Sequence, residues 1–305
     1  MGRAKKTALS VDKVYQYDIS KANSFVISAA FDYTLIEQKI VNYIAMKIHP
    51  PKLDDSNNVV YDLIYDIDYS EICKMSAMPI NGRSYTYITK AITNLKVKNL
   101  DVQMPNKKIT GISFFTRYEY LAGSGLATVE LDTRTVPLVM RMKDDFLKYN
   151  PRYTMLCKSK YSIRIYEWLK ATMDKQQWSA KKSSPTLKIN NDKIPYMTKK
   201  EKEEFFQAHK AIREKDYIIK IDIDIFKENL GIGSSIEGFK MMESRILNKA
   251  RTELNEWSDI LITDISFNNE TNNIRFVANY KTASELALLN VKIEDKINSV
   301  YLPKK

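Results

Sequence analysis

The feature of this sequence that most restricts its fold is an order of elements that occurs twice. In the first half, hydrophobic periodicity predicts a helix opening at the capping box "TLIE", an alternating strand "VVYDLIYDIDY" and a short helix "YSEICKM". The turn "PING" then leads into a long helix, "RSYTYITKAITNLKVKN", and into two strands, "ISFFTRYEYL" and "ATVELD", joined by "AGSG". The second half of the chain repeats this order.

In the second half, the first helix is "YSIRIYEWLKATM", and the strand "YIIKIDIDIF" leads into the short helix "FKENLG". The long helix is "GFKMMESRILNKARTELNEW", and the strands "ILITDISF" and "IRFVANY" enclose the turn "NNETNN". This is the order of a winged helix, in which the short and long helices form a helix-turn-helix and the hairpin is the wing. We predict an α+β fold with two tandem winged-helix domains, residues 1–150 and 151–305, related by a pseudo-twofold internal repeat. Two unrelated α+β domains are the alternative.

The charge balance indicates the class of partner. The 305 residues include 48 Lys and Arg against 37 Asp and Glu, a net charge of +11, which favours a polyanionic partner. No apolar run is long enough for a membrane span, and the basic N-terminus lacks the apolar run of a secretion signal. The two cysteines, Cys73 and Cys157, are isolated, as is usual in a reducing compartment. We therefore expect a cytoplasmic protein without a membrane partner.

The two long helices carry the predicted DNA contacts. Their apolar stripes, Ile88, Ala91, Ile92 and Leu95 in the first and Phe239, Met242, Ile246, Ala250, Leu254 and Trp257 in the second, are expected to face the core. Away from these stripes lie residue types that read base edges or hold phosphates. The predicted DNA-binding residues are Arg83, Ser84, Thr86, Tyr87, Lys90 and Asn94 in the first helix and Lys240, Ser244, Arg245, Asn248, Lys249 and Arg251 in the second. An ordinary solvated face, which in the second helix would include Glu243 and Glu253, is the alternative.

The start of the helix "KSKYSIRIYEWLK" has an unfavourable charge pattern. Lys160 and Arg164 stand four residues apart in its first turns, where like charges repel and the helix dipole prefers anions. A DNA phosphate at this terminus would make the arrangement favourable, with Ser159 either capping the helix or binding the same phosphate. We therefore predict that Ser159, Lys160 and Arg164 bind DNA. The alternative is that both cations are solvated on an outer face, with Glu167 nearby.

Three blocks of the sequence resemble one family. The runs "SFVISAAFDYTLIEQKIVNYI", "SKYSIRIYEWLK" and "FKMMESRILNKARTELNEWSDI" are similar to the iteron-binding plasmid replication initiators, the RepB/RepE-like proteins of theta-replicating plasmids. The resemblance implies tandem winged-helix domains that bind direct repeats at a plasmid origin. It also implies initiation by the monomer, repression of the protein's own promoter by a dimer, and recruitment of host replication proteins such as the helicase and the host initiator. Proteins of this family are not enzymes and need no cofactor.

The chain also departs from the family pattern. Residues 174–216 form a polar, Lys-rich insertion in which 198–215 has helical periodicity, and "DDFLKYNPRYTML" fits an inter-domain linker only loosely. The strand "ISFFTRYEY" is rich in aromatic residues on both faces, which suggests a dimer interface in the first domain. The alternative is that these aromatic side chains fill the domain's own core.

Enzymatic alternatives lack their chemistry in this sequence. A rolling-circle initiator nuclease needs paired histidines for a metal beside its tyrosine nucleophile, whereas the two histidines here, His49 and His209, are far apart. The pairs Asp66/Asp68 and Asp222/Asp224 precede the short helices, where Asp68 or Asp224 would act as an N-cap rather than bind a metal. No phosphate-binding "GxxxxGK[ST]" motif occurs. We predict no enzymatic activity, metal or cofactor. A dedicated transcriptional repressor without a replication role remains a functional alternative.

Overall fold

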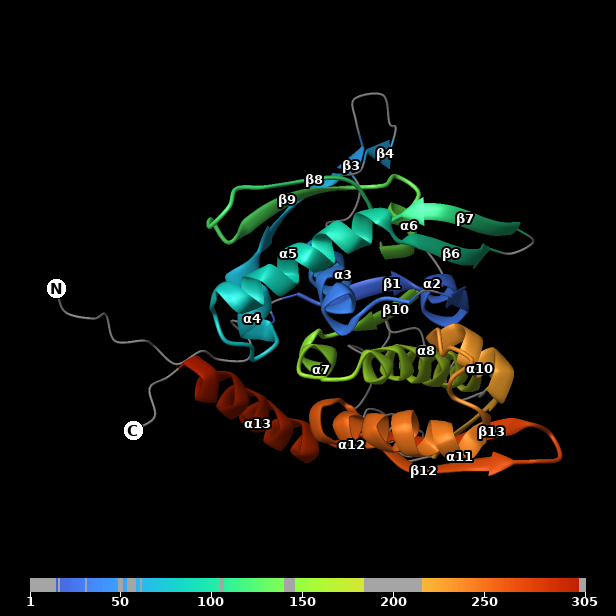
Figure 1. The fold of residues 1–305 in the computed structure, drawn as a ribbon. Coiled ribbons are helices and arrows are strands. Elements are labelled where there is room, and N and C mark those ends of the chain that lie inside the picture. Colours follow the sequence, from blue (N-terminus) through green and yellow to red (C-terminus); the bar gives the residue numbers. More distant parts are fainter. Residues whose placement is uncertain are drawn as a thin grey trace, which may run out of the picture.

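The computed structural model describes residues 15, 17–30, 32–48, 52–53, 59–60, 62–104, 107–139, 146–183 and 216–301 (Figure 1). The N-terminal residues 1–14 and most of the predicted insertion, including the expected helix at 198–215, lie outside the described residues. The first half of the chain comprises the elements from β1 to α7, and the second half those from α8 to α13.

The elements of the first half are β1 (Ile19–Ala22), α2 (Asn23–Ser28), β2 (Ala29–Ala30), α3 (Leu35–Lys47), β3 (Lys52–Leu53), β4 (Val59–Val60), β5 (Ile64–Asp68), α4 (Tyr69–Met75), α5 (Gly82–Val97), β6 (Asn99–Met104), β7 (Lys107–Ser113), β8 (Phe115–Tyr120), β9 (Leu126–Leu131), α6 (Val136–Val139), β10 (Phe146–Tyr149) and α7 (Arg152–Met155). Those of the second half are α8 (Lys160–Ser183), β11 (Tyr217–Asp222), α10 (Ile223–Leu230), α11 (Gly238–Met242), the π-helical turn η3 (Glu243–Leu247), α12 (Asn248–Trp257), β12 (Ile260–Asn268), β13 (Asn273–Tyr280) and α13 (Ala283–Tyr301).

Side-chain caps start the helices that the sequence predicted. Thr34 and Glu37 form the expected capping box of α3, with the Thr34 N–H donating to Glu37 Oε2 at 2.7 Å. Asp68 caps α4 by accepting from the Ser70 N–H at 2.7 Å. In the second half, Asp222 rather than Asp224 is the cap of α10, since strand β11 ends there and the Asp224 N–H donates to it at 2.9 Å.

Two antiparallel sheets have the same strand order. In the first half this order is β5–β9–β8, and in the second half it is β11–β13–β12. In each sheet the strand before the short helix pairs with the second strand of the later hairpin, so that Asp68 lies opposite Leu126 and Asp222 opposite Asn273. The fold is thus a mixed α and β arrangement with antiparallel sheets, and each long helix packs close to a hairpin (Figure 1).

Several elements were not predicted from the sequence. A hairpin, β6–β7, stands between α5 and β8, and β1 pairs with β10 across the first half. Helix α13 follows the last hairpin and runs back toward α4 (Figure 1). At its end the Tyr301 hydroxyl donates to the Met78 carbonyl at 2.6 Å, in the turn between α4 and α5. The last helix therefore connects the second half to the turn between α4 and α5 in the first.

Helix α8 lies between the two halves and packs against both (Figure 1). Toward the second half, the Trp168 ring meets Phe226 and Phe276 at centroid distances of 5.4 Å. Toward the first half, Glu167 accepts a hydrogen bond from Tyr149 and forms an ion pair of 2.5 Å with Lys21. The middle of α8 is therefore enclosed on every side, and its residues 162–169 are all buried.

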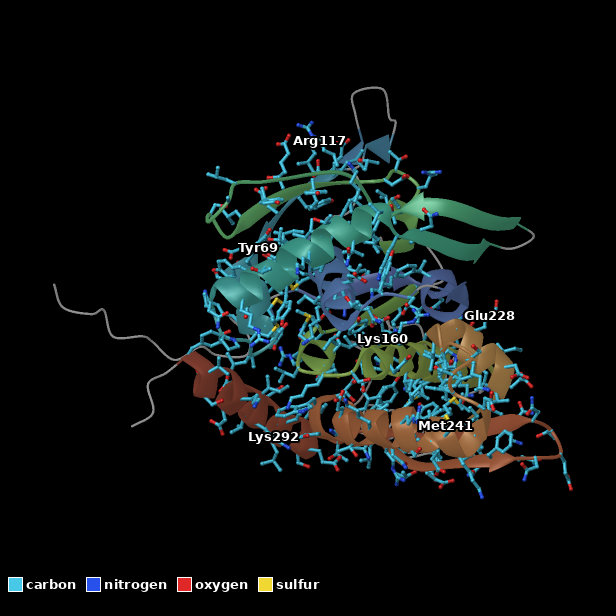
Figure 2. The ribbon with its side chains drawn as sticks, in the orientation of Figure 1. Tyr69, Arg117, Lys160, Glu228, Met241 and Lys292 are labelled. Atoms are coloured by element: carbon cyan, nitrogen blue, oxygen red, sulfur yellow. The ribbon has the colours of Figure 1, made fainter. Side chains whose placement is uncertain are left out.

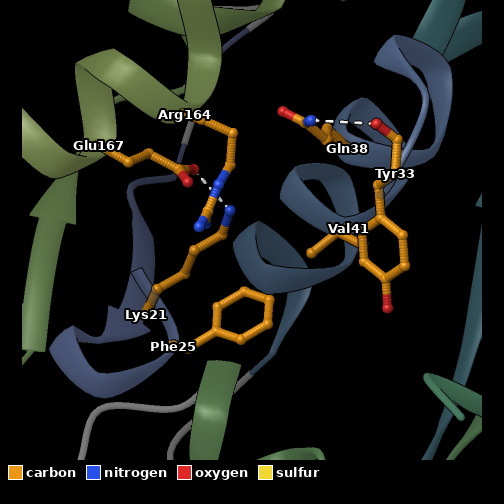
Figure 3. A pocket seen from close by; sticks show the side chains of 7 residues that line it. All are labelled: Lys21, Phe25, Tyr33, Gln38, Val41, Arg164 and Glu167. Carbon is orange, nitrogen blue, oxygen red and sulfur yellow. Dashed lines mark hydrogen bonds and ion pairs between the residues drawn. The ribbon is translucent and has the colours of Figure 1, made fainter. Parts of the chain in front are cut away.

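Arg164 is buried, which contradicts both the predicted contact with a DNA phosphate at the surface and the alternative of a solvated outer face. The residue is only 3% exposed, and its Nη2 donates to the Asn229 carbonyl at the end of α10 at 2.8 Å. Figure 3 shows its guanidinium beside Lys21 and Glu167, around a cavity of about 10 Å³, which is close to the size of one water molecule. Burial lowers the pKa of Arg164 to about 10, against the opposing effect of Glu167. Burial likewise lowers the pKa of Lys21, and Glu167 offsets part of that shift.

A third cation is buried where α3 faces the second half. Lys39 is 4% exposed, and the titratable groups that act on it are the Cys157 thiol and the Glu253 carboxyl group of α12. Burial lowers the pKa of Lys39 to about 8 and raises that of the Cys157 thiol to about 12.

Replacing Glu167 tests the buried cluster. In Glu167→Gln, Lys21 and Arg164 remain buried without their carboxylate, so we expect the free energy of unfolding in urea to fall by roughly 3–5 kcal/mol. The matched control is Glu119→Gln, whose carboxylate pairs with Arg117 but is 63% exposed and should hardly change stability. Equal effects of the two substitutions would contradict the role of the cluster.

Lys39 predicts a dependence of stability on pH. Its folded pKa of about 8 lies below the ordinary value of 10.5, so the unfolded state binds more protons between these two pH values. The stability lost by burying the charged ammonium group therefore decreases as pH rises. The free energy of unfolding of Lys39→Met should therefore exceed that of the wild type by about 3 kcal/mol at pH 7, but only by about 1 kcal/mol at pH 10. A difference that does not change with pH would contradict this account.

Candidate DNA-binding interface

Helix α5 presents one buried and one exposed face. It begins after Asn81, whose side chain accepts from the Ser84 N–H at 3.0 Å. The predicted apolar stripe is confirmed, because Ile88, Ala91, Ile92 and Leu95 are all buried. Ser84 was predicted to contact DNA, but it is 5% exposed and its side chain bonds to Cys73. Ser84 follows the exposed Arg83 in the sequence, but its side chain lies on the side of the helix that packs against α4.

The exposed face of α5 carries cationic, hydroxyl and aromatic groups. The exposed residues from the predicted set are Arg83, Thr86, Tyr87, Lys90 and Asn94. Arg83 lies over the Tyr87 ring, 5.8 Å from its centroid, and its Nε donates to the Tyr87 hydroxyl at 3.2 Å. The helix contains no acidic residue, so its outer face has a positive potential that suits an anionic partner.

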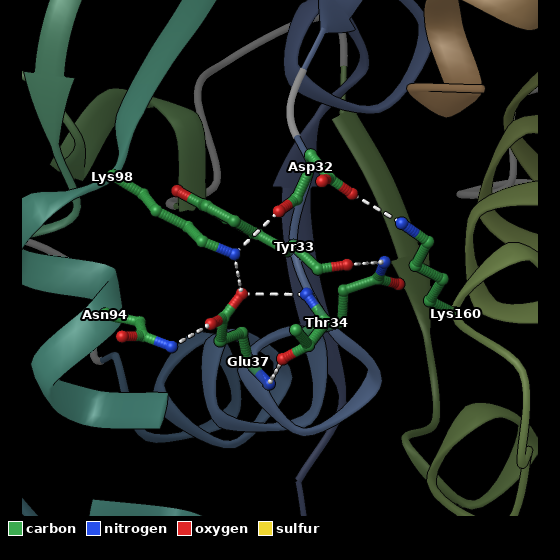
Figure 4. Close-up of polar contacts among 8 residues, drawn as sticks. Asp32, Tyr33, Thr34, Glu37, Asn94, Lys98 and Lys160 are labelled. Atoms are coloured by element: carbon green, nitrogen blue, oxygen red, sulfur yellow. Dashed lines mark hydrogen bonds and ion pairs between the residues drawn. The ribbon is translucent and has the colours of Figure 1, made fainter. Parts of the chain in front are cut away.

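The last turn of α5 is bound to the rest of the first half, as Figure 4 shows. Asn94 Nδ2 donates to Glu37 Oε1 at 3.0 Å, and Lys98 Nζ donates to Glu37 Oε2 at 2.7 Å and to the Asp32 carbonyl at 2.8 Å. Glu37 is fully buried, so these bonds fix α5 against α3. The Asn94 amide therefore positions the helix in this structure.

The carboxylate of Asp32 continues this chain of contacts to α8. It pairs with Lys160, which Figure 2 places in the middle of the molecule, between the elements of the two halves. The hydrogen bond from Lys160 is the main cause of the lowered pKa of Asp32. The cation that the sequence pattern assigned to a phosphate thus pairs with a carboxylate of the protein, in an ion pair whose Lys160 side chain is 27% exposed and whose Asp32 side chain is 76% exposed.

Carboxylate and hydroxyl groups of the protein also satisfy the start of α8. Glu253 accepts from the N–H groups of Lys158 and Ser159 at 3.2 and 3.1 Å, and the Ser159 hydroxyl accepts from the Tyr161 N–H at 3.3 Å. Glu253 is 8% exposed, so the alternative of an ordinary solvated face does not hold for this residue of the second long helix. The anion at this helix terminus is therefore an internal carboxylate, which accounts for the unusual charge pattern.

The second long helix is continuous from α11 to α12 but contains a π-helical turn. Its core residues Met242, Ile246, Ala250 and Leu254 are buried as predicted, whereas Phe239 and Trp257 are half-buried. The wider turn of η3, Glu243–Leu247, adds Leu247 to the core. It also places Ser244 and Arg245 on the outer surface, one turn before Asn248 and Lys249.

The predicted contacts of this helix divide into two groups. Lys240, Ser244, Arg245, Asn248 and Lys249 are exposed. Arg251 is half-buried, and its guanidinium donates to the carbonyls of Ile262, at 3.2 Å, and Thr263. Arg251 therefore holds strand β12 against the helix, a role that a sequence pattern could not separate from DNA binding.

Among the described residues, no group of three or more His, Cys, Asp and Glu side chains could hold a metal ion. No helix in the described ranges is long and apolar enough to cross a membrane. A groove of about 690 Å³ opens between α10, α11 and the β12–β13 hairpin, and its lining includes Asp224, Glu237 and Glu243 beside Lys227 and Lys240. Its mixed charge distinguishes it from the outer face of α5.

Comparison with known proteins adds three findings. Residues 18–170 match the family described as Initiator Replication protein, WH1. A replication initiation protein of Escherichia coli is 24% identical over 247 residues, which is 81% of this chain and 65% of that relative, slightly under two thirds of its length. The crystal structure of Pi initiator protein in complex with iteron DNA is similar in fold, with a TM-score of 0.56 and 11% identity over 88% of this chain and 98% of that chain.

Proposed function

The chain belongs to the initiator replication protein family, and from this premise we propose that it binds double-stranded DNA at repeated sites (iterons) and thereby initiates plasmid replication in the cytoplasm. One observation carries the proposal: the region that matches the family contains α5, a long helix whose outer face is cationic and free of acidic residues. A basic chain with such a helix suits phosphate and base-edge contacts in a major groove. The protein would act by binding, without catalysis or a cofactor of its own.

The proposal includes two winged-helix domains in tandem, residues 1–150 and 151–305, related by a pseudo-twofold repeat. The common strand order of the β5–β9–β8 and β11–β13–β12 sheets supports it, as does the long helix that precedes each hairpin. In this arrangement α5 and the helix from α11 to α12 would each enter a major groove. Helix α8 would mark the start of the second domain while packing against the first.

The exposed groups narrow the predicted set of contacts. We assign DNA contacts to Arg83, Thr86, Tyr87, Lys90, Lys240, Ser244, Arg245, Asn248 and Lys249. Ser84, Asn94, Ser159, Lys160, Arg164 and Arg251 are assigned to internal structure instead, because each is buried or has protein partners described above.

Other copies of the chain and host proteins are also proposed partners. We propose that a dimer represses the protein's own promoter and that the monomer recruits host helicase and initiator. The aromatic residues of 112–120 do not support a dimer interface, because Phe114 and Phe115 are buried, while Tyr118 and Tyr120 stack on one face. Strand β8 nevertheless lies at the edge of its sheet, where its backbone could pair with a second copy.

A dedicated transcriptional repressor is the alternative function. A test of whether the gene and its flanking repeats sustain a replicon separates a repressor from a replication initiator.

Substitutions on the second long helix, in η3 and α12, should affect DNA binding differently from a substitution on α8. Arg245→Ala or Asn248→Ala should weaken binding to the cognate repeat by roughly 1–3 kcal/mol and weaken binding to random DNA much less, since base-edge contacts are lost. Lys160→Ala should leave the salt dependence of binding unchanged, because Lys160 pairs with Asp32. Lys220→Ala removes an exposed cation on β11 and serves as the charge control. If Arg245→Ala and Asn248→Ala weakened binding to cognate and random duplexes equally, the second long helix would not read base edges.

The tandem arrangement predicts the footprint of one monomer. If two helices read one face of the duplex, their sites should be one helical turn, about 10 bp, apart, and roughly 20 bp should be protected. Hydroxyl-radical footprinting on the direct repeats beside the gene measures this spacing. Protection of a single groove would rule out the tandem model, and no protected repeat at all would rule out the proposed function.

A further inference from the structure

The tip of the β8–β9 hairpin, residues 120–126, exposes three apolar side chains on its two faces. Tyr120 is 50% exposed, Leu121 is 76% exposed and Leu126 is 51% exposed. Single exposed apolar residues are ordinary on protein surfaces, but three within one tight turn are not. In the corresponding turn between β12 and β13, residues 269–272, the side chains are Asn, Glu, Thr and Asn. The two hairpins therefore differ in chemistry although their sheets have the same strand order.

The tip does not have the charge of a phosphate-binding loop. Residues 118–130 include no Lys or Arg, and the acidic residues among them are Glu119 and Glu130. Arg117 is turned to the outer side of the sheet, where it pairs with Glu119 (Figure 2). Any contact between this tip and a partner must therefore come mainly from its apolar side chains.

Internal bonds make the tip rigid. The Ser124 hydroxyl donates to the Leu121 carbonyl at 2.8 Å and accepts from the Leu126 N–H at 3.1 Å. Gly123 and Gly125 have φ angles of +81° and +71°, which L side chains rarely adopt, and a Cβ on Gly125 would lie 2.8 Å from the Tyr85 ring. The turn is thus held in one shape, and little conformational freedom remains to be lost on binding.

The tip lies next to the proposed DNA-reading face of α5. Gly125 packs on Tyr85 in the second turn of the helix, and its carbonyl accepts from the Tyr69 N–H at 2.9 Å. Farther along α5, the Thr93 and Tyr118 hydroxyls are 3.5 Å apart. The hairpin therefore runs beside α5, with its tip at the N-terminal end of the helix, which also bears Arg83 and Tyr87 (Figure 1).

We propose that residues 120–126 form an apolar wedge, led by Leu121, that enters the duplex beside the groove occupied by α5 and unstacks a base step. Apolar side chains inserted in this way kink DNA, because they replace base stacking by contacts with protein. A narrow tip with three apolar side chains suits a base step better than a protein interface, which commonly buries about 800 Å² on each partner. The wedge rests on the proposed function and deepens it, since it gives the first hairpin a part in distorting origin DNA.

Leu121→Ser tests the wedge on the full-length protein. The probe is a duplex of the direct repeats beside the gene, labelled at its ends for energy transfer and treated with permanganate to detect unstacked thymines. We expect the wild type to bend the duplex and to produce a reactive step, and Leu121→Ser to lose both signals while its affinity changes less than about tenfold. The control, Ile64→Ser, removes a side chain that is 65% exposed at the other end of the same sheet, and it should behave like the wild type.

The outcomes separate the wedge from the function on which it rests. Equal bending by Leu121→Ser and the wild type would overturn the wedge. If Leu121→Ser bends DNA normally but its free form sediments as a smaller species, the tip is a protein contact and the wedge is also overturned. A wild type that protects no repeat duplex would overturn the proposed function itself. Unchanged melting of Leu121→Ser, expected for a side chain so exposed, shows that the variant is folded.

Discussion

The ion cluster of Lys21, Arg164 and Glu167 is the interaction on which the arrangement of the two halves depends. Two cations and one carboxylate are buried together. Lys21 in β1 pairs with Glu167 in α8, which also accepts a hydrogen bond from Tyr149 in β10. Arg164, also in α8, donates to the backbone at the end of α10. Such a cluster adds little net stability compared with an apolar contact, but a displacement that removes one partner leaves a buried charge unpaired, which costs roughly 3–5 kcal/mol. Its effect is therefore to fix how α8 sits between the halves.

The position of α8 affects both long helices. Helix α8 lies between α5 on one side and α12 on the other (Figure 1). The chain of contacts from Lys98 through Glu37 and Asp32 to Lys160 connects α5 to α8, while Glu253 connects α12 to the start of the same helix. Helix α13 adds a further connection through Tyr301 and Met78. The proposed reading of DNA by both long helices needs a defined spacing between them, and these contacts supply one.

Local patterns in the sequence predicted the parts of the fold that depend on near neighbours. The capping box at Thr34, the cap at Asp68 and the apolar stripes of the long helices follow from spacings of three to four residues. The sequence pattern did not reveal that Arg164 and Glu253 are buried, because their partners lie far away in the sequence. Periodicity also assumes a helix with a single packed face, whereas α8 is enclosed all round. The exposed face of α5 could be predicted, but the internal bonds of Asn94 and Arg251 could not, since amide and guanidinium groups suit backbone carbonyls and carboxylates as well as DNA.

The most direct test of this account is the distance between the two long helices in the free protein. Spin labels at Lys90→Cys on α5 and Lys249→Cys on α12 would report it by double electron–electron resonance, and both sites are exposed, whereas the native Cys73 and Cys157 are buried and should not react. A joint fixed by buried charges predicts one narrow distance distribution in the absence of DNA. A broad or two-peaked distribution would contradict the central claim that α8 holds the two halves in a single arrangement.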